Sequence, residues 1–258
     1  MTLIHPSAVI DPKAELAADV QVGPFSVIGP GVKIGAGTVV GPHVVIDGAT
    51  TIGSNNRFHP FGHIGCQPQD KKYAGEDTRL EIGNGNTFFQ SVTVSTGTTQ
   101  DQGVTRIGDD NWVMAYVHIA HDCQIGSHCI FANNATLAGH VAIGDWVILG
   151  GFTTIHQFCK VGPHAMSAFT AAISQDVPPY VLAAGNRATP NGINSEGLKR
   201  RGFTSEQITT IKRAYKTLYR QNLPLDEAKG QIEAAAVGAP ELQAFVDFFA
   251  ASTRGLIR

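Results

Sequence analysis

Four of the ten histidines of this chain lie in one 23-residue segment, HIAHDCQIGSHCIFANNATLAGH, at positions 118 to 140. The same segment places Asp122 directly after His121 and Gly139 directly before His140. Clustered imidazoles can ligate a metal ion, or one of them can serve as a general base with hydrogen-bonding groups around it. A carboxylate can orient such a base, and a glycine lets a backbone N–H approach a reacting oxygen. The segment therefore indicates either a metal site or an acyl-transfer site.

A six-residue repeat must position these side chains. Large apolar residues recur at every sixth position from 4 to 64, and glycine often follows them. The pattern pauses over 66–81, resumes, pauses again, and then runs from Ile107 to Ile173 with Ser167 as its one polar position. A period of six suits a short strand plus a turn, and three such units close a triangular coil whose strands stack about 4.8 Å apart in parallel. The repeat thus predicts an all-β solenoid with an apolar interior.

Position within an 18-residue coil predicts where each histidine lies around this solenoid. Residues 18 apart stack in adjacent coils, and one corner receives His118, His121, His140 and His156. His128 and His164 fall on another corner, so we interpret them as surface residues.

Composition and cysteine spacing narrow the class of protein. The 258 residues are 43% apolar and 16% charged with a net charge of -2, which describes an ordinary soluble globular chain and gives no sign of nucleic-acid binding. The start lacks a secretory signal, and no apolar stretch is long enough for a membrane span, which favours a cytoplasmic protein without stable membrane insertion. The four cysteines form no CxxC pair, which argues against a zinc ribbon or a disulfide framework. Three of them, Cys123, Cys129 and Cys159, occupy an inward position of the repeat and are predicted to fill the core.

Helical signals replace the repeat near the C-terminus. The turn-rich segment 185–192 follows the last coil, and Thr204 with Gln207 forms a capping box ahead of an apolar stripe. A second helix is predicted around 225–232, and a third begins at Pro240. We therefore divide the chain into a β-solenoid, 1–189, and a small α-helical domain, 190–258.

Several long motifs resemble a known enzyme family. Glycine-containing hexapeptides are similar to those of the hexapeptide-repeat acyltransferases, whose parallel β-helix is left-handed. Residues 118–140, GGFTTIHQFCKVG (150–162), QDVPPYV (175–181), EGLKRRGF (196–203) and STRGLIR (252–258) resemble the UDP-N-acetylglucosamine O-acyltransferase family, over essentially the whole chain. The resemblance implies transfer of an (R)-3-hydroxyacyl group from acyl carrier protein to the sugar 3-hydroxyl, the first step of lipid A biosynthesis. It implies no cofactor, since the phosphopantetheine arrives on the carrier protein. The pairing of Asp122 with His121 and the absence of a thiolate or carboxylate ligand set predict that the site works without a metal.

The resemblance also implies roles for individual residues. His121 would be the general base, Asp122 would orient it, and the Gly139 N–H would receive the oxyanion. The residues implied in substrate binding are Asp70, Lys72, His118, His140, His156, Gln157, Asn194, Glu196, Arg200 and Arg201. The basic residues of the helical domain would dock the acidic carrier protein and pair with the diphosphate.

Phe169 stands where relatives that take long acyl chains carry glycine, so the resemblance implies that it measures chain length. The alternative is that its ring only packs against a neighbouring subunit. The family also implies a homotrimer with sites between subunits. Departures from the family pattern occur at VSTGT (94–98), where relatives often have a His-Arg-Gly-Thr run, and at Arg187, where they often have histidine. A metal-dependent carbonic anhydrase of the same fold and an acetyl-CoA-dependent acetyltransferase stay open as alternatives.

Overall fold

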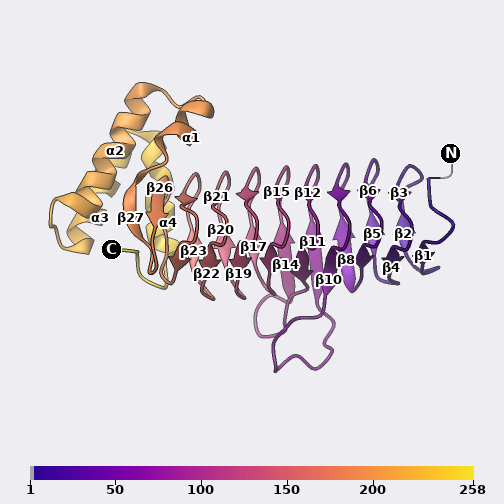
Figure 1. The fold of residues 1–258 in the computed structure, drawn as a ribbon. Helices are drawn as coiled ribbons and strands as arrows, with labels where there is room; N and C mark the ends of the chain where they lie inside the picture. The colour runs from indigo at the N-terminus through magenta and orange to yellow at the C-terminus, as the bar shows by residue number, and fades with distance from the viewer. Residues whose placement is uncertain (1–2) are drawn as a thin grey trace.

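The computed structural model describes residues 3–258 as a long three-sided solenoid with a group of helices at its C-terminal end (Figure 1). Residues 1 and 2, with which the predicted β-solenoid begins, lie outside the described residues. Each coil contributes one short strand to each of three parallel sheets, and equivalent residues pair across adjacent coils, as Ile119 pairs with Leu137. The predicted all-β solenoid is therefore confirmed.

Within residues 3–258 the three sheets contain nine, eight and ten strands. The nine-stranded sheet consists of β1 (Val9–Ile10), β4 (Val27–Ile28), β7 (Val45–Ile46), β10 (His63–Cys66), β13 (Thr93–Ser95), β16 (His118–Ile119), β19 (Thr136–Leu137), β22 (Thr154–Ile155) and β25 (Ala172–Ile173). The eight-stranded sheet consists of β2 (Glu15–Leu16), β5 (Lys33–Ile34), β8 (Ala49–Ile52), β11 (Arg79–Ile82), β14 (Val104–Ile107), β17 (Gln124–Ile125), β20 (Ala142–Ile143) and β23 (Lys160–Val161). The ten-stranded sheet consists of β3 (Gln21–Val22), β6 (Val39–Val40), β9 (Arg57–Phe58), β12 (Thr87–Phe88), β15 (Trp112–Val113), β18 (Ile130–Phe131), β21 (Ile148–Leu149), β24 (Met166–Ser167), β26 (Val181–Ala184) and β27 (Thr189–Ile193).

The interior is an apolar column with a few polar residues that find partners. Cys123, Cys129 and Cys159 are buried, which confirms their predicted place in the core, and burial raises the pKa of the Cys123 thiol to about 12. A thiol so hard to ionise is not a nucleophile. Ser167, the polar position of the repeat, is buried as well, and its hydroxyl lies 2.8 Å from the Thr153 hydroxyl.

The C-terminal helices close one end of the solenoid. They are α1 (Ser195–Arg200), α2 (Ser205–Arg220), α3 (Leu225–Ala236), the 3-10 turn η1 (Pro240–Leu242) and α4 (Gln243–Ala251). The predicted capping box is present, since the Thr204 hydroxyl accepts a hydrogen bond from the Gln207 N–H. The helix α1 was not predicted, because six residues are too short to show an apolar stripe. β27, the last strand of the ten-stranded sheet, runs antiparallel to β26, and the Tyr215 hydroxyl of α2 accepts from the Gly192 N–H.

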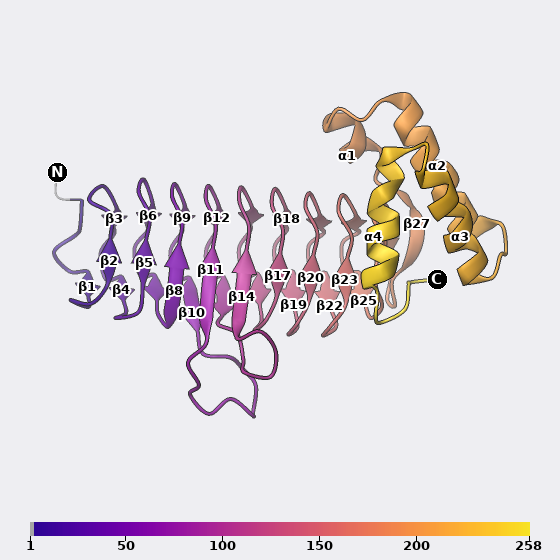
Figure 2. The same cartoon turned by 180° about the vertical axis from the view of Figure 1, so that it is seen from behind.

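Two insertions leave the solenoid at one corner. The loop 67–78 joins β10 to β11, the loop 96–103 joins β13 to β14, and both project from the same edge in Figures 1 and 2. The same corner continues through the turns 120–123, 138–141 and 156–159, which we call the histidine corner. The pauses in the repeat are thus the insertions of this corner.

Candidate active site

His121 and Asp122 form a hydrogen-bonded pair in the first of these turns. The His121 Nδ1 lies 2.8 Å from Asp122 Oδ2, and the carboxylate is 2% exposed. Asp122 has a φ of 60°, a left-handed conformation that aspartate tolerates better than most residues. Burial raises the pKa of the Asp122 carboxyl, but the hydrogen bonds from His121 and Thr98 outweigh burial and leave it below its usual value. Asp122 is therefore an ionised acceptor for the imidazole N–H.

Gly139 lies directly beside the His121 ring. A Cβ at position 139 would meet the ring Cε1 at 2.5 Å and Nε2 at 2.7 Å, so a larger residue would displace the imidazole. Within residues 3–258 the Gly139 N–H donates to no other group. A free backbone N–H next to the outer nitrogen of a histidine can donate a hydrogen bond to an oxyanion that forms there.

His140 and His118 flank the pair. The His140 ring meets the His121 ring edge-on, with centroids 5.0 Å apart, and stacks on Phe158. The His118 Nδ1 lies 2.7 Å from the Thr93 hydroxyl, and burial followed by the charge of His121 lowers the pKa of His118. His118 differs from the expected placement, because it belongs to strand β16 beside the corner and not to the turn itself.

His156 and Gln157 occupy the third turn, one coil beyond His140. The His156 Nδ1 lies 3.1 Å from an Arg254 guanidinium nitrogen, which the C-terminal segment 252–258 brings to this corner. His156 therefore lies at the predicted corner, but its partner is Arg254. His121 and His140 instead contact each other, and each of them has a carboxylate partner.

A groove of about 970 Å³ begins at Thr136 beside the histidine corner and runs past His156. It continues to Arg187 and Arg254 at the helical end of the solenoid. Arg187, a departure from the family pattern, therefore lines this groove, and its cation suits an anionic group of a long flexible ligand.

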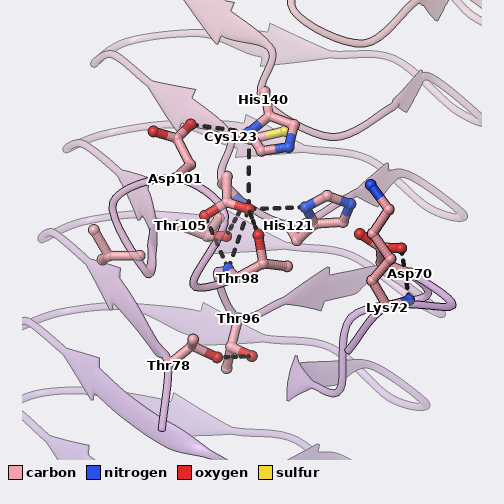
Figure 3. A network of polar contacts seen from close by, with 12 residues as sticks. Asp70, Lys72, Thr78, Thr96, Thr98, Asp101, Thr105, His121, Cys123 and His140 are labelled. Atoms are coloured by element: carbon pink, nitrogen blue, oxygen red, sulfur yellow. Dashed lines mark hydrogen bonds and ion pairs between the residues drawn. The ribbon is translucent and has the colours of Figure 1, made fainter. Parts of the chain in front are cut away.

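The loop 67–78 brings Asp70 and Lys72 beside His121, as Figure 3 shows. The Asp70 carboxylate accepts from the Lys72 N–H at 3.0 Å, which shapes the loop. Ser95, in the other departure from the family pattern, is buried on β13 with its hydroxyl 3.5 Å from Cys66 Sγ.

The segment 194–201 lies at a different corner, formed by the turns 126–129, 144–147 and 162–165, which we call the Trp146 corner. Asn194 caps α1 and donates from Nδ2 to the His164 carbonyl at 3.1 Å. The Arg201 guanidinium lies 5.3 Å above the Trp146 ring and 3.2 Å from His164 Nδ1. Glu196 and Arg200, also on α1, are exposed. Within one chain these four predicted binding residues lie in one segment, away from the corner that holds His121, and Asn194 is buried.

His164 is not the surface residue that its position in the coil predicted. Its ring packs between Trp146 and Tyr180, and burial, together with the nearby Arg201 charge, lowers the pKa of His164 to about 4. The position within a coil takes only the solenoid into account, whereas Phe203 and Arg201, which cover the His164 ring, belong to the helical domain.

The pKa of His164 predicts an acid-sensitive fold. Between about pH 6.5 and 4 the unfolded chain binds a proton at His164 that the folded chain does not, so stability decreases as the pH falls. Because the ring is partly exposed, we expect a loss of about 1 kcal/mol between pH 7 and 5. Thermal unfolding of wild type and His164→Phe at both pH values measures it, because phenylalanine keeps the stacking and cannot titrate. An equal loss in the two proteins would contradict this assignment.

Two residues that touch the histidine corner were not predicted. Thr98 donates to Asp122 from both its N–H and its hydroxyl, and Asp101 lies 2.9 Å from His140 Nδ1. Both lie in the loop 96–103, where the repeat pauses and counting by 18 no longer places a residue. The pause at this corner is the one signal that pointed to the loop.

Comparisons with known proteins agree with this geometry. Residues 176–257 match a family model described as Udp N-acetylglucosamine O-acyltransferase, Domain 2, and residues 13–48 and 105–139 match Bacterial transferase hexapeptide (six repeats). An acyl-[acyl-carrier-protein]--UDP-N-acetylglucosamine O-acyltransferase of Herminiimonas arsenicoxydans is 64% identical over 100% of both chains, and one from Neisseria gonorrhoeae is 59% identical, also over 100% of both.

Solved structures agree as well. The UDP-N-acetylglucosamine acyltransferase of Francisella novicida matches with a TM-score of 0.97 at 43% identity, covering 99% of this chain and 94% of that one. The enzyme of Moraxella catarrhalis matches with a TM-score of 0.97 at 42% identity, covering 99% and 100%. The solenoid is therefore the left-handed parallel β-helix that the resemblance implied. Identity of this extent, spread over both the solenoid and the helical end, means that the chain belongs to the UDP-N-acetylglucosamine O-acyltransferase family.

Proposed function

We propose that this chain transfers an (R)-3-hydroxyacyl group from acyl carrier protein to the 3-hydroxyl of UDP-N-acetylglucosamine, with His121 as the general base. This is the first step of lipid A biosynthesis, and the curated relatives carry the name of an enzyme for this acyl donor and this acceptor. The observation that carries the residue assignment is the His121–Asp122 hydrogen bond beside the free Gly139 N–H.

The pair performs the proton transfers of this reaction. When His121 Nδ1–H donates to Asp122, the outer Nε2 keeps a lone pair and takes the proton from the sugar 3-hydroxyl. The sugar oxygen forms a bond to the thioester carbonyl carbon, and the oxyanion that develops accepts a hydrogen bond from the Gly139 N–H. Collapse of this intermediate breaks the carbon–sulfur bond, and the phosphopantetheine thiolate takes the proton back from His121. The ester and the free thiol balance the reaction without a cofactor.

A third corner of the solenoid carries exposed aromatic rings in several successive coils and supports a homotrimer. The exposed rings of Phe25, Phe61, Tyr116, Phe152 and Phe169 all lie on the turns between the ten-stranded and nine-stranded sheets, which we call the aromatic corner. The eight-stranded sheet, opposite this corner, carries ion pairs such as Lys33–Glu15 and Arg106–Glu81. Three copies arranged around the aromatic corner would bury these rings and leave the charged sheets in water.

This arrangement would also complete the site. When three-sided solenoids meet at one edge, the nine-stranded sheet of one copy faces the ten-stranded sheet of the next. The histidine corner of one copy then lies near the Trp146 corner of its neighbour. We therefore assign Asn194, Glu196, Arg200 and Arg201 to the nucleotide of a substrate whose sugar reaches His121 of the adjacent copy, with Asp70 and Lys72 at the sugar.

The trimer gives a direct prediction. We expect light scattering to yield three times the 27.3 kDa mass of the chain. Phe61→Glu with Phe152→Glu places charges at the aromatic corner and is expected to give inactive monomers, whereas Lys33→Glu on the eight-stranded sheet should stay trimeric. A fully active monomer would contradict the arrangement.

The histidine corner also contains a possible ligand set for a metal, since donor atoms of His121, Asp122 and His140 lie within 4.8 Å of one another. Hydrogen bonds already use these atoms: Asp122 accepts from Thr98 and His121, and His140 Nδ1 faces Asp101. We infer that the site works without a metal, and the relatives' names do not favour a carbonic anhydrase.

Chelation tests this inference. We expect dialysis against EDTA to leave turnover unchanged, and elemental analysis of the active enzyme to find no stoichiometric zinc, iron or cobalt. Activity that is lost on chelation and restored by one of these ions would reverse the assignment.

The helical domain offers a docking surface for the acidic carrier protein. The exposed cations of α1 and α2 are Lys199, Arg200, Lys212, Arg213, Lys216 and Arg220. The groove past His156 would then receive the phosphopantetheine arm. An enzyme that uses acetyl-CoA has no need of such a surface. Among residues 3–258 no helix is long and apolar enough to cross a membrane, and a cytoplasmic location stays a prediction.

The assay that tests the proposed function combines the purified protein, UDP-N-acetylglucosamine and 3-hydroxyacyl carrier proteins of graded length. We expect release of carrier-protein thiol together with a 3-O-acylated sugar nucleotide. Acetyl-CoA supplied in place of the carrier protein should give no product, and equal turnover with acetyl-CoA would favour the acetyltransferase instead.

A further inference from the structure

The insertion loop 96–103 folds back onto the histidine corner, and Thr98 of this loop binds Asp122. Figure 3 shows Thr98 and Asp101 of the loop next to His121 and His140. The Thr98 N–H donates to Asp122 Oδ1 at 2.9 Å and lies 3.1 Å from Oδ2, and the Thr98 hydroxyl donates to Oδ2 at 2.6 Å. Thr98 and Asp122 are each 2% exposed, so water does not compete for these hydrogen bonds. Both oxygens of the carboxylate are therefore bound from the loop side.

Asp122 lies within reach of two imidazoles. Its Oδ2 is 2.8 Å from His121 Nδ1 and 3.8 Å from His140 Nδ1. A small rotation of the carboxylate would exchange one partner for the other, so the pairing with His121 needs a second restraint. Thr98 supplies it, because its two donors fix the plane of the carboxylate.

The same loop supplies a separate carboxylate for the competing imidazole, that of His140. Asp101 Oδ2 lies 2.9 Å from His140 Nδ1, so His140 has a carboxylate of its own. The loop thus contributes one residue to each of the two histidines that meet edge-on. Thr96, in the same loop and also buried, instead accepts a hydrogen bond from the Thr78 hydroxyl, and the hydrogen bonds described for residues 3–258 include none between Thr96 and Asp122.

We propose that the loop 96–103 assigns one carboxylate to each imidazole, with Thr98 and Asp101 as positioning residues that keep His121 in the tautomer with its proton on Nδ1. This inference rests on the proposed role of His121 as the base. Thr98 holds Asp122 toward His121, Asp101 keeps His140 away from Asp122, and His121 Nε2 stays free for the sugar hydroxyl. Through Thr98 and Asp101 the insertion positions the catalytic base, and it does more than connect two strands.

Thr98→Val is the first test, because it removes the hydroxyl with little change of shape. We expect kcat to fall about 10-fold with KM nearly unchanged, which corresponds to loss of one hydrogen bond to a charged group. Thr98→Ser keeps the hydroxyl and should restore most of the activity. Thr96→Val makes the same change at the neighbouring buried threonine and should behave as wild type.

A double-mutant cycle separates positioning from a merely structural role. If Thr98 acts through the carboxylate, Thr98→Val should cost little further activity once Asp122→Asn is present. Independent losses that multiply in the double variant would overturn the proposal. Asp101→Ala alone is expected to lower activity less than Thr98→Val does. The variant with both substitutions should lose more activity than the product of the two single losses.

Nitrogen NMR of the histidine rings in the substrate-free trimer gives a readout independent of turnover. His121 should show the Nδ1–H tautomer in wild type and in Thr96→Val, and a mixture of tautomers in Thr98→Val. An unchanged His121 tautomer with unchanged kcat in Thr98→Val would refute the role of the loop, although His121→Ala would still be inactive. Full activity of His121→Ala would instead reject the base on which this inference rests.

Discussion

Replacement of His121 by alanine is expected to lower turnover by about 10²- to 10⁴-fold, the usual contribution of a general base. The side chain lies outside the apolar column, in a turn where its ring is partly exposed, so the solenoid should lose little stability. Steady-state kinetics with a saturating concentration of the 3-hydroxyacylated carrier protein measures the loss of turnover. Circular dichroism with thermal unfolding checks the fold. The variant should keep its affinity for UDP-N-acetylglucosamine better than its turnover.

His5→Ala is the control for this experiment. His5 is exposed near the start of the solenoid, several coils away from His121, and its Nδ1 lies 2.9 Å from the Ser7 hydroxyl. It should keep most of the activity. A His121→Ala enzyme that retains more than about a tenth of wild-type turnover would contradict the assignment of the base.

Phe169→Gly is expected to move the preferred acyl chain to greater length. Phe169 is 71% exposed in the turn between β24 and β25, so its ring lies at a corner of the solenoid and not inside the column. In the proposed trimer this turn faces the groove between subunits, where a ring would limit the space for an acyl chain. At about 0.8 kcal/mol for each buried CH₂, four methylenes that cannot be buried cost about 3 kcal/mol, a selectivity on the order of 10²-fold.

Competition between carrier proteins with different acyl chains measures this selectivity. We expect wild type to prefer a 3-hydroxyacyl chain shorter than about 14 carbons, with about 10 as the optimum, and Phe169→Gly to prefer longer chains. Phe152→Gly removes a similarly exposed ring from the same corner one coil earlier and should keep the wild-type length profile. Wild type that prefers about 14 carbons, with a profile unchanged in Phe169→Gly, would show that the ring only packs against a neighbour.

The parts of the structure that follow the repeat could be predicted from the sequence. His121 and His140 are one coil and one residue apart, and their rings indeed meet, because successive coils stack in register. The buried cysteines followed from the same count. Periodicity placed these residues because each coil contacts only its neighbours, so position along the chain converts directly into position in space.

The remaining features depend on contacts between segments that no period relates. Thr98 and Asp101 lie in an insertion, where the length of the loop and not the coil determines which side chain reaches Asp122 or His140. Arg201 buries His164 from the helical domain, and Arg254 reaches His156 from the C-terminus, 98 residues away in the chain. Such contacts are tertiary, and local patterns carry little information about them.

The reversed direction of β27 has a consequence for how these molecules behave in concentrated solution. A stack of parallel strands ends in a row of unpaired N–H and C=O groups, onto which another molecule could add its own coils and so begin a fibre. At the C-terminal end of the ten-stranded sheet, β27 pairs with β26 in the opposite direction, and the Tyr215 side chain of α2 binds its Gly192 N–H. A further parallel coil finds no matching edge there. The strand that turns back therefore protects the protein against growth from this end.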